Sequence, residues 1–432
     1  MLARTGLSAG ALAFGGMAGT VSVARGRVSF HGAHQAGITT PPQARILFQA
    51  FDATAGSRGE LERLLEAWSH AARSMCEGDL LPGPSAGNRA PSDTGEALGL
   101  AASRLTITVG FGPPLFDSRY GLAGMRPAAL VDLPPFPTDR LDPTRCGGDL
   151  AVQACADDPQ VTFHAVRNLT RIARHMNAAQ PRWSQTGFAK TPGSAPASET
   201  GRNLLGFKDG TNNLRGDDTA KMNTNVWVGD EGPAWMQDGT YLVVRRVRTH
   251  IEKWDSSDLD EQEGVFGRRK VSGAPFGGTE EFDPVAPAEE PRNSHIILAN
   301  PRRFGSERER ILRRGYNYTD GLLPTDGSMP ASSSPATNAT RDTSSSRFSS
   351  VWPLTTGSTN TSSTPAAQSS PCHPAYSLAA TSARRYFTTR ETRQPDARRT
   401  AFLRSSGRLA ASRGGRQPVL GCLGTGMGPG RP

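Results

Sequence analysis

The sequence predicts an α+β fold, and three observations support this. Short segments of apolar or alternating residues have the pattern of buried or half-buried strands. Two longer segments carry apolar residues at the three- and four-residue spacing of an amphipathic helix. These segments follow one another in the order β-α-β-β-α-β, which is the order of a ferredoxin-like unit.

The first half of the chain supplies all six elements of such a unit. The expected strands span residues 44–51, 105–111, 150–154 and 183–188, and the expected helices span residues 59–76 and 159–176. In the first helix Leu61, Leu64, Leu65 and Trp68 recur at helical spacing and should face a sheet. We therefore expect a complete ferredoxin-like domain over residues 28–195.

The second half begins in the same way but does not complete the pattern. Residues 240–247 alternate as a strand and a short helix is expected near residues 257–263. Two further strands are expected at residues 295–299 and 311–318, while a closing strand and a last helix are missing. The prediction is a second, incomplete ferredoxin-like domain over residues 196–327.

Residues 328–432 have the composition of a disordered tail. They are rich in Ser, Thr and Pro with little apolar periodicity, so they cannot bury enough surface to offset chain entropy. The tail also contains 13 arginines, no lysine and three acidic residues, so its net charge is +10, against +9 for the whole chain. Because the rest of the chain is nearly neutral, we expect no nucleic-acid partner.

The first residues resemble a leader for export. Within residues 1–27, Arg4 is followed by a short apolar run rich in Ala and Gly, which is too short to span a bilayer. A disordered leader is the alternative, and no stable membrane insertion is expected. The five cysteines show no CxxC spacing, although Cys146 and Cys155 could pair in an oxidising compartment.

One local motif points to a ligand site. It consists of Gly206, Phe207, Lys208, Asp209, Gly210 and Thr211 in succession. Two glycines that flank an acid let the backbone turn tightly and approach a flat ligand, with the carboxylate pointing inward. A surface turn is the simpler interpretation, and the motif alone favours it because Asp-Gly is common in hairpins.

A histidine and an arginine change that balance. His295 lies between polar and apolar residues at the start of an expected strand, and Arg313 follows 18 residues later within a β-prone segment. A buried arginine is costly unless it faces an anion or a cavity. Together, an acid, a histidine and an arginine could supply a metal ligand, a proton shuttle and a charge stabiliser.

These segments resemble the dye-decolourising (Dyp-type) haem peroxidases, in particular the exported subgroup that includes deferrochelatases. The resemblance rests on the motif at residues 206–210, on Ser294-His295-Ile296 and on the segment at residues 312–316, and it extends over residues 28–326. It implies a pair of ferredoxin-like domains of the dimeric α+β barrel type, with haem b held by the second. The implied partners are hydrogen peroxide, an organic reductant and haem or porphyrin, and a homo-oligomer is left open.

The resemblance also assigns roles to residues. His295 would be the iron ligand, Asp209 the acid and base that moves the proton of hydrogen peroxide, and Arg313 the stabiliser of negative charge. Gly206, Phe207, Lys208, Gly210, Thr211 and Arg313 would contact the cofactor. His250 is the rival ligand, but its spacing to Arg313 does not match the family pattern. An ionised Asp209 would be consistent with activity at acid pH.

The chain departs from the family at both ends. A twin-arginine signal is implied, but only Arg4 precedes the apolar stretch. After residues 321–323 the family pattern of a strand and a final helix gives way to the Ser/Thr/Pro tail, which suggests a shifted reading frame near residues 325–328. The expected function is a haem peroxidase that oxidises dye-like or phenolic reductants; the alternatives are a deferrochelatase and a non-catalytic haem-binding protein or inactive remnant.

Overall fold

The computed structural model describes residues 26–81, 91–133, 139 and 141–320, together with the backbone of two strands at Pro330–Ser333 and Tyr376–Ala380. All of them belong to the unit Met1–Thr389. The expected leader up to residue 25 and the second unit, Arg390–Pro432, lie outside the described residues. Among the described helices, none is long and apolar enough to cross a membrane.

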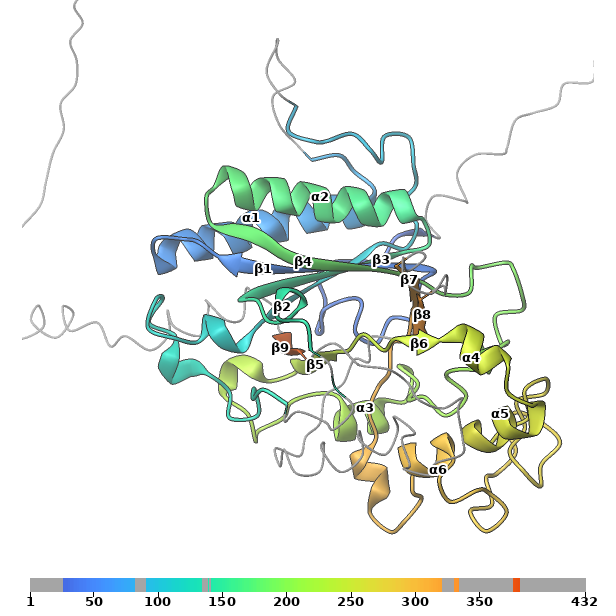
Figure 1. Ribbon diagram of the computed structural model, residues 1–432. Helices are drawn as coiled ribbons and strands as arrows, with labels where there is room; N and C mark the ends of the chain where they lie inside the picture. Colours follow the sequence, from blue (N-terminus) through green and yellow to red (C-terminus); the bar gives the residue numbers. More distant parts are fainter. Residues whose placement is uncertain are drawn as a thin grey trace, which may run out of the picture. The chain divides into compact units, whose positions relative to one another are not determined.

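Four strands and two helices build the N-terminal domain. In chain order they are β1 (Arg45–Ala53), α1 (Arg58–Glu77), β2 (Thr106–Phe111), β3 (Leu150–Ala156), α2 (Pro159–His175) and β4 (Ala179–Phe188). The strands pair antiparallel in the order β2-β3-β1-β4, and both helices cover one face of this sheet (Figure 1). This is the ferredoxin-like arrangement, so the prediction for the first half is confirmed.

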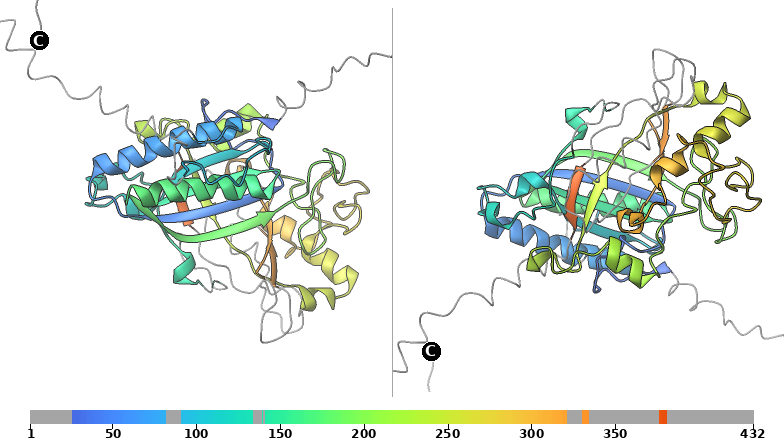
Figure 2. Two further views of the ribbon diagram at one scale, coloured as in Figure 1. Left: turned by 90° about the horizontal axis from the view of Figure 1, so that it is seen from above. Right: turned by 90° about the horizontal axis from the view of Figure 1, so that it is seen from below.

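The two helices form where the sequence supplies caps and an apolar face. The side chain of Ser57 accepts a hydrogen bond from the backbone N–H of Glu60 at the start of α1, and Gly78, with φ 81°, ends the helix. Figure 2 shows α1 and α2 side by side on the sheet. The buried Trp68 links them, because its Nε1 donates a hydrogen bond of 2.9 Å to the carbonyl of Leu169.

The second half has shorter elements. They are α3 (Thr219–Asn225), β5 (Thr240–Val244), β6 (Thr249–His250), α4 (Ile251–Asp255), α5 (Leu259–Phe266), α6 (His295–Ala299) and β7 (Asn317–Thr319). In the described part of the chain, short 3-10 helices lie at Ala234–Met236 and Ser306–Glu309 in this half, and at Pro113–Leu115, Ala123–Met125 and Pro143–Arg145 in the first half. β5 and α5 confirm the strand and the helix expected here, although β5 ends three residues earlier than predicted.

The structure corrects two strands that were predicted in the second half. Residues 295–299 form helix α6 after Ser294, which has extended backbone at the N-cap position. A run of five apolar residues fits a helix or a strand equally well, so periodicity could not decide. Of residues 311–318, only those in β7 pair as a strand. Before β7, the backbone of Arg313 is bonded to the Asn213 side chain instead of a neighbouring strand.

The described strands belong to one sheet in the order β5-β9-β2-β3-β1-β4-β7-β8-β6. β8 (Pro330–Ser333) and β9 (Tyr376–Ala380) lie in the expected tail, so the expectation of disorder is wrong for these two segments. β8 pairs with β6 and β7, and β9 pairs with β2 and β5, through backbone hydrogen bonds that do not depend on side-chain type, which is why composition did not predict these strands. β9 lies between β2 and β5 (Figure 2). The rest of the tail is outside the described residues.

Candidate active site

The carboxylate of Asp209 lies in a tight loop that begins the second half. Gly206 has φ +84°, in the left-handed region that favours glycine, and a Cβ at this position would also displace the end of the Lys270 side chain, whose Cε would lie 2.9 Å away. Gly210 has φ +130°, which also requires glycine. The backbone N–H of Asp209 donates to the carbonyl of Gly201 at 2.8 Å. The glycines predicted to shape a turn therefore do so.

Arg313 joins this loop from a segment about a hundred residues later in the chain. Its Nη2 donates to Oδ1 of Asp209 at 2.9 Å, and the side chains are 35% and 26% exposed. A Cβ on Gly315 would lie 3.9 Å from the other oxygen of Asp209. The pair is therefore reachable from solvent, as a site that receives a small substrate must be.

Asn213 fixes the position of Arg313. The backbone N–H of Arg313 donates to Oδ1 of Asn213 at 2.9 Å, and Nδ2 of Asn213 donates to the Arg313 carbonyl at 2.6 Å. One side-chain amide thus satisfies the hydrogen-bonding needs of both the backbone N–H and the backbone carbonyl of Arg313, as a neighbouring strand would. The sequence contained no periodicity that could have predicted this contact.

A cluster of packed aromatic side chains connects His295 to the loop that contains Asp209. Phe207 is buried and stacks on Phe266 with ring centroids 4.0 Å apart, and Trp254 contacts both rings edge-on. The imidazole of His295, the first residue of α6, lies 5.9 Å from the Phe266 ring. The cluster therefore connects the Asp209 loop to α5 and α6. Phe207 serves as packing on the described contacts.

Lys208 and Thr211, both expected to contact a cofactor, each donate a hydrogen bond to Glu281. Nζ of Lys208 lies 2.6 Å from Oε2 of Glu281 and 3.0 Å from Glu199, and Oγ1 of Thr211 donates to Glu281 at 2.9 Å. The hydrogen bond that Lys208 donates to Glu281, with the one that it donates to Glu199, raises the pKa of Lys208. These groups hold the loop in place. Glu281 was missed because nothing in its surrounding sequence marks it.

A second polar cluster lies beside His295. Glu290 and Ser294 are buried, and neither Oε2 of Glu290 nor Oγ of Ser294 has a hydrogen-bond partner among the described residues. Burial raises the pKa of Glu290, although the hydrogen bond from Phe276 opposes this. Gly267, with φ +76°, makes room for both side chains, since a Cβ there would lie 2.9 Å from each oxygen.

The donor groups present fit haem better than a metal held by protein alone. In the described ranges, no group of three or more His, Cys, Asp or Glu side chains could hold a metal ion. Haem needs only one axial side chain because the porphyrin supplies the other ligands. A half-buried imidazole beside aromatic rings, with a carboxylate and a guanidinium in the same half of the chain, matches that need.

The rival ligand His250 ends β6, where its backbone pairs with Pro330.

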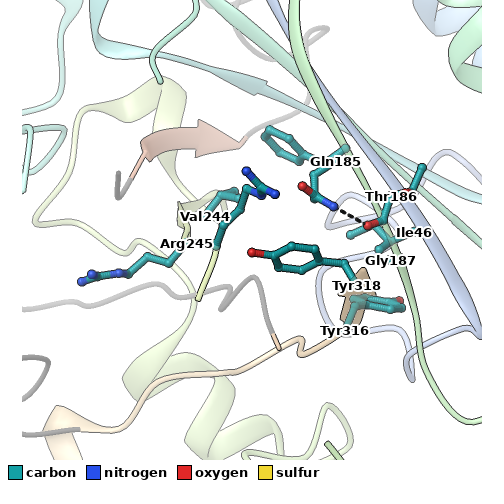
Figure 3. A pocket seen from close by; sticks show the side chains of 10 residues that line it. Ile46, Gln185, Thr186, Gly187, Val244, Arg245, Tyr316 and Tyr318 are labelled. Atoms are coloured by element: carbon teal, nitrogen blue, oxygen red, sulfur yellow. Dashed lines mark hydrogen bonds between the residues drawn. The ribbon is translucent and has the colours of Figure 1, made fainter. Parts of the chain in front are cut away.

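A pocket in the described part of the structure is lined by none of the predicted site residues. It lies between β1 and β4 on one side and the ends of β5 and β7 on the other, with Gln185, Val244 and Tyr318 among its lining residues (Figure 3). Cys146 and Cys155 are free, so the possible disulfide is not formed.

Comparison with known proteins agrees with this arrangement. Residues 35–189 match the family model for the N-terminal part of Dyp-type peroxidases, and residues 200–332 match that for the C-terminal part. The deferrochelatase of Escherichia coli K12 is 39% identical over 303 residues, which are 68% of this chain and 71% of that protein. The chain belongs to the Dyp-type peroxidase family.

Solved structures lead to the same conclusion. DtpA from Streptomyces lividans, in an oxyferrous/water mixed complex, is 36% identical with a TM-score of 0.71, over 83% of this chain and 96% of DtpA. A DyP-type peroxidase from Streptomyces coelicolor is 37% identical with a TM-score of 0.71, over 84% of this chain and 96% of that protein. The protein is therefore a peroxidase with two-part Dyp-type architecture, and its cofactor is haem.

Proposed function

We propose that this Dyp-type peroxidase binds haem through His295 and uses Asp209 and Arg313 to handle hydrogen peroxide. The observation that carries the proposal is the contact of 2.9 Å between the Arg313 guanidinium and the Asp209 carboxylate. These side chains come from distant parts of the chain, and Asn213 holds the arginine backbone in place. A bound haem supplies the redox-active iron that takes up the oxidising equivalents of the peroxide.

The two side chains divide the work on the peroxide. The Asp209 carboxylate accepts a proton from one peroxide oxygen and returns it to the oxygen that leaves as water. Arg313 donates hydrogen bonds to the oxygen on which negative charge develops. Because the arginine is already oriented by Asn213 and by Asp209, little reorganisation is needed during the reaction.

A substitution of Asp209 tests this role. In Asp209→Asn the peroxide-dependent oxidation of a dye should fall by about 10²–10⁴-fold, which is the usual contribution of a positioned acid and base. Haem binding, followed by the Soret absorption band, should be retained. Asp217→Asn, at an exposed position in the same half of the chain, is the control. An unchanged rate in Asp209→Asn would remove Asp209 from the mechanism.

The ligand assignment needs its own test. His295→Ala should lose the Soret band after reconstitution with haemin, whereas His250→Ala should keep it. Loss of the band in His250→Ala, with retention in His295→Ala, would exchange the two roles. Haem binding without peroxide-dependent turnover in the unmodified protein would identify a non-catalytic haem-binding protein.

Release of iron from haem is the second candidate activity, because several relatives at 39% identity are named deferrochelatases. The two activities differ in their products. A peroxidase yields oxidised phenol or dye, whereas a deferrochelatase yields free porphyrin with the tetrapyrrole intact. Chromatography of the products after incubation with haem, with and without peroxide and a phenolic reductant, separates them.

We also propose that the protein is exported. The support is the apolar run rich in Ala and Gly within residues 1–19 that follows Arg4. Fractionation of cells that express the full chain, and of cells that express a chain lacking residues 1–27, tests this. Retention of both proteins inside the cell would contradict export.

A further inference from the structure

The residue next to the proposed catalytic arginine has a different environment. Arg314 is only 2% exposed, whereas the Arg313 side chain is 35% exposed. Nη1 of Arg314 donates to the carbonyl of Thr40 at 2.6 Å, and Nη2 donates to Oε1 of Gln43. Two consecutive arginines therefore bind different parts of the protein: Arg313 binds the Asp209 loop, and Arg314 binds the segment that leads into β1.

The partner of Arg314 is itself fixed to the N-terminal sheet. Gln43 is fully buried, and its Nε2 donates to the carbonyl of Arg104 at 2.8 Å and to Oγ1 of Thr106, in β2, at 3.0 Å. A continuous series of hydrogen bonds thus leads from the start of β2 through Gln43 to Arg314. The peptide between Arg314 and Arg313 extends it to the site.

Apolar packing supports the same connection. Ile38, in the segment that contains Thr40 and Gln43, forms a buried cluster with Leu312, the residue before Arg313, and with Leu214, the residue after Asn213. The backbone approaches closely as well, because a Cβ on Gly216 would lie 2.4 Å from the carbonyl oxygen of Thr39. Residues 38–43 are therefore packed between both segments that supply the catalytic pair.

The guanidinium of Arg314 is charged and buried. It donates to the neutral oxygens of Thr40 and Gln43, and the thiol of Cys155 and the phenol of Tyr316 also interact with it. Burial raises the pKa of the neighbouring Tyr316, so this phenol stays protonated at neutral pH and supplies no negative charge. Burial of such a cation is unfavourable, and hydrogen bonds to its N–H groups must offset the cost. A guanidinium can hold two acceptors at fixed angles, whereas an ammonium group cannot.

We propose that Arg314 is a positioning residue: it fixes Arg313 beside Asp209 by binding Thr40 and Gln43, and so makes the peroxide site depend on the N-terminal domain. The inference rests on the proposed role of Arg313. It adds that the N-terminal domain, which supplies none of the proposed catalytic residues, determines how well that role is performed.

The test compares Arg314→Lys and Gln43→Leu with a matched control, Arg245→Lys. Arg245 is also buried, with 1% exposure, but it pairs with Asp139. Two quantities are measured on the haem-loaded full chain: the rate constant for reaction with hydrogen peroxide, and the dissociation constant of fluoride from the shift of the Soret band. Fluoride is a small anion whose affinity reports the position of the Arg313 guanidinium without any turnover.

We expect Arg314→Lys to weaken fluoride binding and to lower the peroxide rate by about tenfold each, because small displacements of a catalytic group have effects of this size. Gln43→Leu, which removes one acceptor, should have a smaller effect in the same direction. Arg245→Lys should lower the unfolding temperature without changing either quantity. In an Arg313→Leu background, Arg314→Lys should cause no further loss, since the positioning residue acts through Arg313.

Other outcomes distinguish the two proposals. If Arg313→Leu weakens fluoride binding but neither Arg314→Lys nor Gln43→Leu does so, Arg314 is structural only and the inference fails alone. Equal effects of Arg314→Lys in the presence and absence of Arg313 would also overturn it. If Arg313→Leu changes neither quantity, the role of Arg313 is wrong and this inference falls with it. Should Arg314→Lys fail to fold, Gln43→Leu still gives the answer.

Discussion

The N-terminal domain and the second half of the chain are stabilised in different ways. In the N-terminal domain α1, α2 and the strands bury one large cluster of apolar side chains, which includes Trp68 and extends to Trp235 and Tyr241 of the second half. In the second half a small apolar cluster surrounds Leu214 and Leu312, and polar contacts such as Lys208–Glu281 and Asp209–Arg313 connect the loops. The regular half provides a rigid support, and the irregular half carries the proposed chemistry.

This difference shows how a site can be precise without regular secondary structure. Asp209 lies in a loop, Arg313 precedes β7, and His295 begins a helix of five residues. Each is held by side-chain contacts to a distant part of the chain, not by its own element. Loops positioned by a scaffold commonly carry binding and catalytic groups, because they can vary without disturbing the core.

The largest difference between the two regions is expected for a substitution in the core of the N-terminal domain, which should lower the stability of the protein. Trp68→Ala should lower the free energy of unfolding by about 3–5 kcal/mol, because it removes a buried aromatic side chain and leaves a cavity. Urea denaturation measures this loss. The peroxide rate per folded, haem-loaded molecule should stay close to that of the unmodified protein. A large fall in that rate would show that the two regions are less separate than their packing suggests.

A smaller effect is expected for the polar support of the site loop. Glu281→Gln should lower the free energy of unfolding by about 1.5–3 kcal/mol, the usual value for a hydrogen bond to a charged group, because it breaks the pair with Lys208. Unlike Trp68→Ala, this change should also slow the reaction with peroxide, since the Asp209 loop is then less well fixed. Thr94→Val, in the N-terminal domain, is a control for loss of a polar contact far from the loop.

The same pair predicts a dependence of stability on pH. Burial acts to raise the pKa of Glu281, but hydrogen bonds from Lys208, Thr200 and Thr211 outweigh it and hold this pKa below the ordinary value of 4.5. Because the folded-state pKa is lowered, the stabilisation is present above pH 4.5 and is lost as the pH falls through the folded-state pKa. Unfolding temperatures measured between neutral and acid pH should therefore fall less steeply in Glu281→Gln.

The smallest effect is expected for an exposed ion pair in the second half. Arg215 and Asp217 lie 2.9 Å apart, with side chains 80% and 69% exposed. Water and salt screen such a pair, so Asp217→Asn should change neither the unfolding temperature nor the peroxide rate measurably. A clear loss of either would mean that surface charge contributes to the second half more than the buried contacts indicate.

The sequence predicted the fold of the N-terminal domain better than that of the second half. The six elements of the N-terminal domain were all predicted, because each long segment buries one face and so leaves a periodic pattern, although β4 begins four residues before the predicted strand at residues 183–188. The strand predicted at residues 295–299 was wrong because five apolar residues carry too little periodicity to separate α from β. β8 and β9 were not predicted because pairing through backbone hydrogen bonds leaves no side-chain pattern.

The sequence by itself determined the order of the N-terminal elements and which acid, histidine and arginine to examine, because local periodicity and motif spacing are properties of neighbouring residues. Only the tertiary structure decided that Lys208 binds Glu281, 73 residues away, and that Arg314 binds Thr40, 274 residues away. Such contacts depend on how the folded chain brings distant segments together. No local pattern records them, and they hold the proposed site in place.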